Sequence, residues 1–215
     1  MAGVKVSRRY ESPRRREQAA ETRERILHAA RRLFEAQGYA ATSMNAVAAE
    51  AGVALKTVYV SFESKSGLLR ALWHVLLRGD AGPEPVGERG WYREVLDEPD
   101  PARQLRLNAR NSRVVKDRVS GLMEVLDAAA AVEPEIRTLW TRIQSEFYDN
   151  QRAVVRSLHR KRALRPGLGV ARATDIVWAL NQPTLYHHLV RDRGWSPARY
   201  EDWLGETFCS QLLAR

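Results

Sequence analysis

The sequence predicts an all-α protein with two domains. Apolar residues recur at spacings of three and four rather than two, which is the period of amphipathic helices and not of strands. Three helices of the second domain are expected to begin with proline at the first helical position, where a missing N–H costs no hydrogen bond. These prolines are Pro101, Pro134 and Pro197.

The composition is that of an ordinary globular protein and excludes several classes. Of 215 residues, 44% are hydrophobic and 28% are charged, so we expect a folded chain. No apolar run is long enough to span a membrane, and the basic N-terminus has no apolar segment of a secretory signal behind it, so we expect a cytoplasmic protein. The single cysteine, Cys209, excludes an intrachain disulfide and a zinc cluster. It is expected to be a buried small hydrophobe, with a redox sensor as the alternative. No cofactor is expected.

The net charge of +9 is concentrated in the first part of the chain, which favours a polyanionic partner. Nucleic acid and an anionic membrane surface both satisfy this, but the chain has no basic amphipathic helix with exposed aromatic residues for a membrane. We expect a mobile basic arm at residues 1–17, a first domain at 18–82 and a second domain at 83–215. The boundary lies in the glycine- and proline-rich segment 79–90.

Local signals place four helices in the first domain, over about 17–37, 44–51, 55–61 and from 65 onward, with Gly38 and Ser64 at helix ends. Three residues have the spacing of a helix-turn-helix. Ala48 is small where two helices cross, Gly52 permits the positive φ of the tight turn, and Val58 packs the second helix on the first. A basic arm in front of this motif points to double-stranded DNA.

Residues 19–73 resemble the DNA-binding domain of the TetR family of bacterial transcriptional regulators. The matching segments are 38–43, 47–53 and 57–69, and the segments 173–180 and 194–204 of the second domain are similar to family members more weakly. The resemblance implies a homodimer whose second short helix enters the major groove of a palindromic operator. It also implies a C-terminal helical domain that dimerises and usually binds a small-molecule effector.

By position in the motif, the resemblance places Leu55, Lys56 and Thr57 at the start of the recognition helix, where side chains reach base edges. Lys56 is the expected base reader, because an ammonium can bond O6 and N7 of guanine; a phosphate contact is its alternative. Two positions depart from the family pattern. Ala54 stands where Ser or Thr is usual, which removes a side-chain N-cap, and Ser61 stands where His is common.

Other positions in the motif hold the DNA backbone in the family. Here they are occupied by Thr42 or Ser43, by Tyr59 and by Lys65, which can offer hydroxyls, a phenol and an ammonium to phosphates. Tyr59 has a second interpretation as a buried core aromatic. The arginines at 14–16 either screen phosphates nonspecifically, which we favour, or enter a minor groove.

The second domain carries no enzyme signature: it has no glycine-rich phosphate loop, no metalloprotease His-Glu pair and no nucleophile with its base. His187 and His188 are adjacent, so they point about 100° apart on a helix and cannot share a metal ion. We therefore expect neither an enzyme nor a metal site.

Polar residues that interrupt apolar stripes mark an effector pocket, with ordinary core as the alternative. Besides the helix after Pro101, we expect helices over about 134–164, 171–191 and 197–213. The third should kink or break at Pro183, which cannot donate to the carbonyl of Ala179. The expected pocket residues are Asn108, Ser112, Met123, Trp140, Phe147, Trp178, Asn181 and Tyr186.

The last two helices carry wide apolar faces that a domain of this size can hardly bury alone, which predicts a symmetric four-helix dimer interface. The expected interface residues are Ile176, Val177, Leu180, Tyr200, Trp203, Leu204 and Phe208.

These observations predict a sequence-specific DNA-binding transcriptional regulator, a homodimeric repressor that a small-molecule effector releases. An effector-independent regulator or an activator is the nearest alternative. A helical enzyme or ligand carrier with a vestigial helix-turn-helix is the other, and it leaves the basic arm, Lys56, Tyr59 and Lys65 unexplained.

Overall fold

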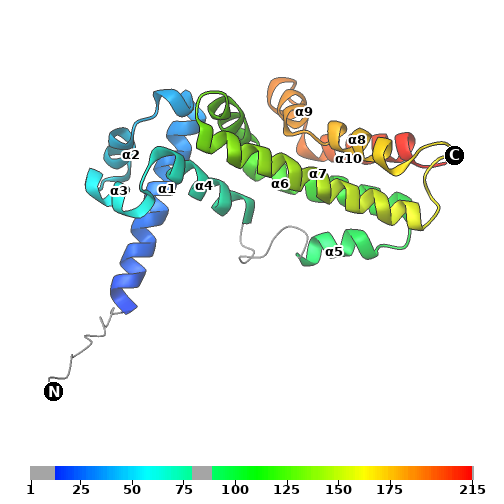
Figure 1. Cartoon of the computed structure of the whole chain (residues 1–215), viewed down its shortest axis with the longest axis horizontal. Coiled ribbons are helices and arrows are strands. Elements are labelled where there is room, and N and C mark those ends of the chain that lie inside the picture. The colour runs from blue at the N-terminus through cyan, green and yellow to red at the C-terminus, as the bar shows by residue number, and fades with distance from the viewer. Residues whose placement is uncertain (1–12, 79–88, 215) are drawn as a thin grey trace, which may run out of the picture. The chain divides into compact units, whose positions relative to one another are not determined.

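The computed structural model describes residues 13–78 and 89–214 and places most of them in helices (Figure 1). No β-strand forms in these two stretches, where the only β-bridge is an isolated antiparallel one between Leu164 and Leu213. The predicted all-α fold class is therefore confirmed. No helix in the described residues is both long and apolar enough to cross a membrane.

The helices follow one another in the order α1 (Pro13–Ala41), α2 (Met44–Ala51), α3 (Leu55–Phe62), α4 (Lys65–Arg78), α5 (Gly90–Asp97), α6 (Pro101–Ala130), α7 (Pro134–Arg160), α8 (Val170–Leu180), α9 (Pro183–Tyr186), the π-helix η2 (His187–Asp192) and α10 (Pro197–Leu212).

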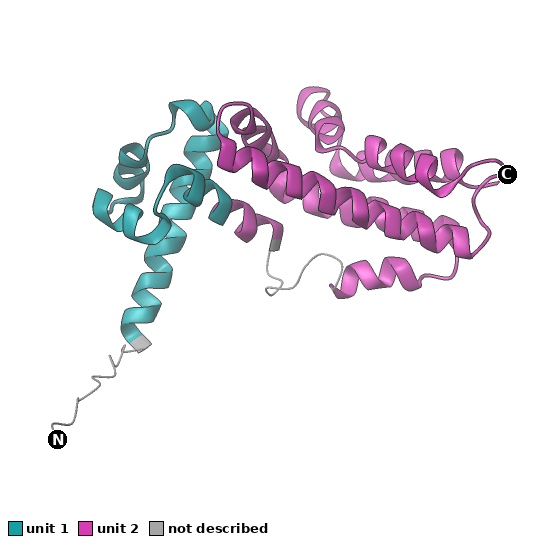
Figure 2. Cartoon of the chain, in the orientation of Figure 1, with its two compact units in different colours: residues 1–71 teal, residues 72–215 magenta. Residues whose placement is uncertain are grey.

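The chain forms two compact units, residues 1–71 and residues 72–215 (Figure 2). Helix α4 begins in unit 1 and continues into unit 2. The predicted domain boundary near residue 82 lies outside the described residues, as do residues 1–12 of the predicted basic arm.

Helix α1 begins at Pro13, so the expected start near residue 17 is wrong and residues 13–17 are helical rather than part of an arm. The physical reason is that proline suits the first helical position and that arginine and glutamate are good helix formers. The backbone leaves helical geometry at Gly38 (φ 79°, ψ 173°), where a helix end was predicted. Ile26 and Phe34 of this helix are fully buried and anchor the core of unit 1.

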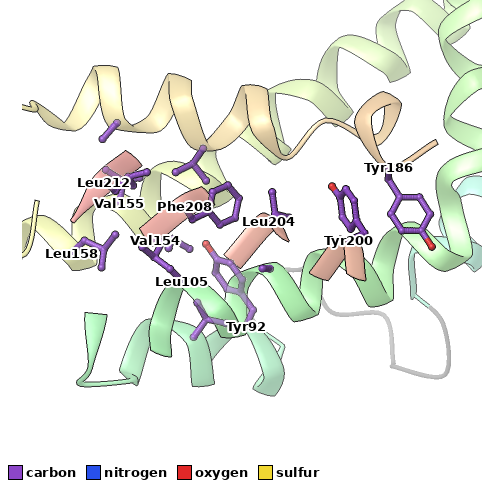
Figure 3. Packing of buried hydrophobic residues seen from close by; sticks show 14 residues of the cluster. Tyr92, Leu105, Val154, Val155, Leu158, Tyr186, Tyr200, Leu204, Phe208 and Leu212 are labelled. Atoms are coloured by element: carbon purple, nitrogen blue, oxygen red, sulfur yellow. The ribbon is translucent and has the colours of Figure 1, made fainter. Parts of the chain in front are cut away.

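Unit 2 has a core to which α5, α6, α7, α8, α9 and α10 all contribute (Figure 3). Helix α10 supplies Tyr200, Leu204 and Phe208, and the ring of Tyr200 meets the ring of Tyr186 edge to face, with centroids 4.9 Å apart. Helix α5 was not predicted. It is a short helix whose buried residues are Tyr92 and Val95, and its formation depends on that burial rather than on a local signal.

The predicted break at Pro183 is confirmed. Helix α8 ends at Leu180, Gln182 adopts an extended backbone (φ −64°, ψ 139°), and α9 restarts at Pro183. Proline causes this twice over, since it has no N–H to donate and it excludes helical geometry in the residue before it. The expected helical stretch over 171–191 therefore consists of three pieces, α8, α9 and η2. Helix α7 ends at Arg160 rather than near residue 164, because Arg162 takes a positive φ of 57°.

Candidate nucleic-acid interface and ligand cavity

The three motif residues of unit 1 do what their spacing predicts. Helix α2 ends at Gly52, which is left-handed (φ 63°, ψ 41°) and donates its N–H to the carbonyls of Ala48 and Ala49. Val58 of α3 is fully buried and Ala48 is 3% exposed, so the two short helices pack through small and branched aliphatic side chains. Unit 1 therefore contains a helix-turn-helix.

Helix α3 lacks a side-chain cap at its start. Ala54 has the extended backbone of an N-cap residue (φ −67°, ψ 141°), but a methyl group accepts no hydrogen bond from the first turn. The neighbouring helix α2 has the cap that α3 lacks, since Ser43 Oγ accepts from the Ala46 N–H at 3.0 Å.

Replacing Ala54 by serine should stabilise the protein against unfolding by about 1 kcal/mol, because the new hydroxyl can accept an orphan N–H of α3. Urea unfolding measures the gain, and hydrogen exchange of the α3 amides assigns it to unit 1. The matched control is Ala54→Val, which adds a side chain without an acceptor and should bring no such gain. A serine variant no more stable than the valine variant would contradict this.

One face of α3 is exposed. Leu55 is 39% exposed, Tyr59 47% and Val60 75%, and Lys56 is also exposed, whereas Thr57 is half-buried. The exposure of Tyr59 decides against its interpretation as a core residue. Val60 was missed by the sequence reasoning, although its spacing of four from Lys56 would have placed both on this face.

Thr42, Ser43 and Lys65 make contacts within unit 1. Thr42 is buried and its hydroxyl donates to the Gly38 carbonyl at 2.8 Å, while Ser43 is exposed and caps α2. Lys65 Nζ donates to the backbone carbonyl of Tyr39 at 2.9 Å and lies 4.2 Å from the centroid of the Tyr39 ring. The ammonium of Lys65 therefore ties the start of α4 to the end of α1.

Unit 2 contains a cavity of about 120 Å³. Its walls come from the C-terminal half of α4 and from α5, α6 and α7, with Asn181 and Pro183 beside the break after α8. The predicted residues that line it are Asn108, Ser112, Met123, Phe147 and Asn181.

The other three predicted pocket residues are not among the residues that line this cavity. Tyr186 is buried against Tyr200 instead, and its hydroxyl donates to Asp117. Trp178 packs edge-on against Tyr148, with ring centroids 6.2 Å apart, and Trp140 is half-buried. Trp140 was expected from the apolar face of its helix, and Trp178 and Tyr186 from their place beside the break at Pro183, but packing decides which side chains border the cavity.

Sequence reasoning also missed several lining residues. Trp73 and Leu77 of α4, and Trp91 and Tyr92 of α5, line the cavity together with Lys116 of α6. The sequence did contain a signal for Lys116. This lysine lies four residues after Ser112 and three before Val119, so helical spacing places all three on one face. The helices α4 and α5 are separated from α6 in sequence, so no local pattern connects their aromatic residues to this site.

Residues 26–72 match the family model described as "Bacterial regulatory proteins, tetR family". The chain is also 30% identical over 172 residues to the probable HTH-type transcriptional regulator ArpR of Pseudomonas putida, a match that covers 77% of this chain and 79% of ArpR. The chain belongs to the TetR family. Unit 1 holds the helix-turn-helix of this transcriptional regulator, and unit 2 is its C-terminal helical part.

Two further comparisons agree. The HTH-type transcriptional regulator AcrR of Shigella flexneri is 31% identical over 114 residues, which are 52% of this chain and 50% of AcrR, so the match spans half the length of that relative. The structure of the SmeT–triclosan complex, from Stenotrophomonas maltophilia, aligns with a TM-score of 0.69 over 90% of this chain and 92% of SmeT, at 21% identity. This second likeness shows the TetR-family fold.

In this TetR-family chain, most of the expected interface residues lie in the protomer's own core. Tyr200, Leu204 and Phe208 lie in the packed core of unit 2 (Figure 3). These three and Val177 are 0% exposed, so the expectation that one domain could not bury them is wrong. They pack against α5, α6 and α7, which the periodicity of the last two helices could not reveal. The remaining three, Ile176, Leu180 and Trp203, are half-buried.

Cys209 is half-buried beside this core. Its Sγ donates weakly to the Ala102 carbonyl at 3.7 Å, and burial raises the pKa of the thiol above its usual value. A raised pKa lowers the thiolate fraction at neutral pH and therefore the reactivity of the sulfur.

Proposed function

We propose that this TetR-family regulator is a repressor, that it binds a palindromic operator as a homodimer in the bacterial cytoplasm, and that a small molecule in the cavity of unit 2 releases it. One observation carries the proposal. Trp73 and Leu77, which line the cavity, belong to α4, and the same helix begins at Lys65 directly after α3. A ligand that displaces these two side chains therefore acts on α4, the helix that follows the helix-turn-helix in the chain.

On the DNA side, the exposed face of α3 supports the proposal. Leu55, Lys56 and Thr57 form the first turn of α3, and side chains in the first turn of a recognition helix reach base edges. Tyr59 has an exposed phenol that can hold a phosphate. We assign Ser43 to a phosphate contact at the start of α2, with Thr42 and Lys65 positioning the backbone around it.

Dimerisation is part of the proposal because two recognition helices about 34 to 36 Å apart can read successive major grooves. Ile176 and Leu180 of α8 and Trp203 of α10 are the half-buried members of the expected interface, and we assign the contact between protomers to them. An effector that shifts α4 then changes the separation of the two helices, which should weaken operator binding by about 1 to 3 kcal/mol.

The first experiment is fluorescence anisotropy of the full-length protein on DNA from upstream of its own gene, with a scrambled duplex of equal length, across a salt series. We expect a preference of about 10³-fold or more for a duplex that holds the operator at physiological salt. Binding driven by charge alone would show no preference and would collapse as salt rises. If the upstream duplex shows no preference, selection from random sequences replaces it, and failure to enrich any sequence would refute sequence-specific repression.

A further inference from the structure

Lys116 is a buried lysine in the wall of the cavity. The residue is 3% exposed, and Nζ donates to Asn181 Oδ1 and, at 2.8 Å, to Tyr200 Oη. Both acceptors are uncharged, and burial lowers the pKa of Lys116 well below its ordinary value. An ammonium has three protons, so one donor position is left after these two bonds.

The described residues supply Lys116 with no counter-ion. The nearby carboxylates of Asp117 and Glu201 both pair with Arg113, at 2.8 Å and 3.0 Å, and Asp117 also accepts from the Tyr186 hydroxyl. Glu146, the acidic residue of the lining, is exposed and lies 3.6 Å from Arg142. A buried charge without a partner is costly, so an anion that enters the cavity would relieve an existing penalty.

A second donor lies beside Lys116. Ser112 precedes it by one helical turn, and Ser112 Oγ accepts from Asn181 Nδ2 at 2.8 Å. Because this oxygen acts as acceptor, its own proton is still available for donation. Lys116 Nζ and Ser112 Oγ therefore contact the oxygen and the nitrogen of one amide group, which places two donors side by side in the cavity wall.

The rest of the lining is mainly apolar and aromatic. Its apolar members are Trp73, Leu77, Trp91, Val115, Val119, Met123, Ile143, Phe147 and Pro183. A fully hydrated inorganic ion would gain little from such walls, whereas an organic molecule would bury its body against them.

We propose that the ligand of this cavity is a carboxylic acid with an apolar body, and that its two carboxylate oxygens accept hydrogen bonds from Lys116 and Ser112. The inference rests on the proposed function in taking the cavity as the effector site. A single ammonium matches the single charge of a carboxylate, whereas a phosphate dianion calls for a second cation, which the lining does not hold. An amine would meet Lys116 as a like charge.

The test compares acids with their own primary amides, which keep shape and size but carry no charge. The probes are hexanoate, octanoate, decanoate and phenylpropanoate, each with its matched amide. Trp73 and Trp91 line the cavity, so tryptophan fluorescence of the full-length protein reports binding, and calorimetry checks the affinities. We expect at least one acid to bind, about 10-fold or more tightly than its amide.

Three variants connect that preference to the two donors. Lys116→Met should abolish it, and Ser112→Ala should reduce it by about 2- to 10-fold. Lys161→Met is the matched control: Lys161 also lies in unit 2 and donates to the uncharged Gln104 Oε1 at 2.7 Å, but it does not line the cavity, so its loss should leave the preference intact. Circular dichroism checks that each variant is folded. If Lys116→Met does not fold, Ser112→Ala still tests the proposal.

The inference is overturned if amides bind as tightly as acids, if no acid in the series binds, or if the preference survives in both cavity variants. The same probes in the operator anisotropy assay separate it from the proposed function. Acids that bind through Lys116 without loosening the operator would contradict release while leaving the ligand class intact. Neutral or cationic compounds that release the operator from wild type and Lys116→Met alike would support release by an effector but contradict a carboxylic acid as the ligand class.

Discussion

Replacing Lys56 by alanine will lower the affinity for the operator by about 5- to 150-fold and will flatten discrimination at one base pair of each half-site. The reason is the place of Lys56 on the exposed first turn of α3, from which an ammonium can bond O6 and N7 of guanine. A good contact of this kind contributes about 1 to 3 kcal/mol of discrimination against the wrong base. Anisotropy with the operator and with single-base variants of it measures both effects.

The control for this prediction is Tyr59→Phe, which removes a phenolic hydroxyl from the same face of α3 but keeps the ring. A phosphate contact carries no sequence information, so this variant should weaken binding to all duplexes alike. If Lys56→Ala behaved in the same way, with the salt slope reduced by about one and discrimination unchanged, Lys56 would be a phosphate contact and not a base reader.

At pH values below the pKa of the buried lysine, replacing Lys116 by methionine will raise the free energy of unfolding of the ligand-free protein by on the order of 1 to 4 kcal/mol. The reason is that the variant no longer buries an ammonium without a counter-ion. Part of this gain is offset by about 1 kcal/mol for each lost hydrogen bond, to Asn181 and to Tyr200. Urea unfolding of both proteins between pH 7 and about pH 10 measures the difference.

The gain from Lys116→Met will shrink as the pH rises. Burial lowers the pKa of Lys116 in the folded state below the value of about 10.4 that it has when unfolded. In the window between these two values the unfolded state binds more protons, so wild-type stability rises with pH there, and the cost of the buried charge is gone above the window. Burial raises the pKa of Tyr200, so its phenol stays neutral throughout.

Lys56→Met is the control for this second prediction, because it removes a lysine that is exposed in the folded state as it is in the unfolded state. Its difference from the wild type should not change with pH over the same range. A stability difference for Lys116→Met that is equally independent of pH would show that the buried amine stays protonated over this range, so that burial does not lower its pKa.

Local sequence signals determined the helix-turn-helix of this protein. Gly52 ends α2 because only a residue without a Cβ takes a left-handed conformation at little cost, and Ser43 starts α2 because its hydroxyl accepts a free N–H. Proline set the first residue of α6, α7 and α10 and the break after α8 in the same way. Each of these effects acts within one helical turn, so a few neighbouring residues are enough to predict it.

The ligand cavity and the buried faces of unit 2 were decided by tertiary structure. Sequence reasoning placed Ser112 on an inward face and Tyr186 beside the break at Pro183, both in the pocket, but Tyr186 packs on Tyr200 whereas Ser112 borders the cavity. It also could not show that Phe208 is covered within one protomer, or that Trp73 of α4 comes to line the cavity beside Lys116 of α6. Helical spacing determines which side of a helix is apolar; which other helix covers that side depends on the packing of residues far apart in the chain.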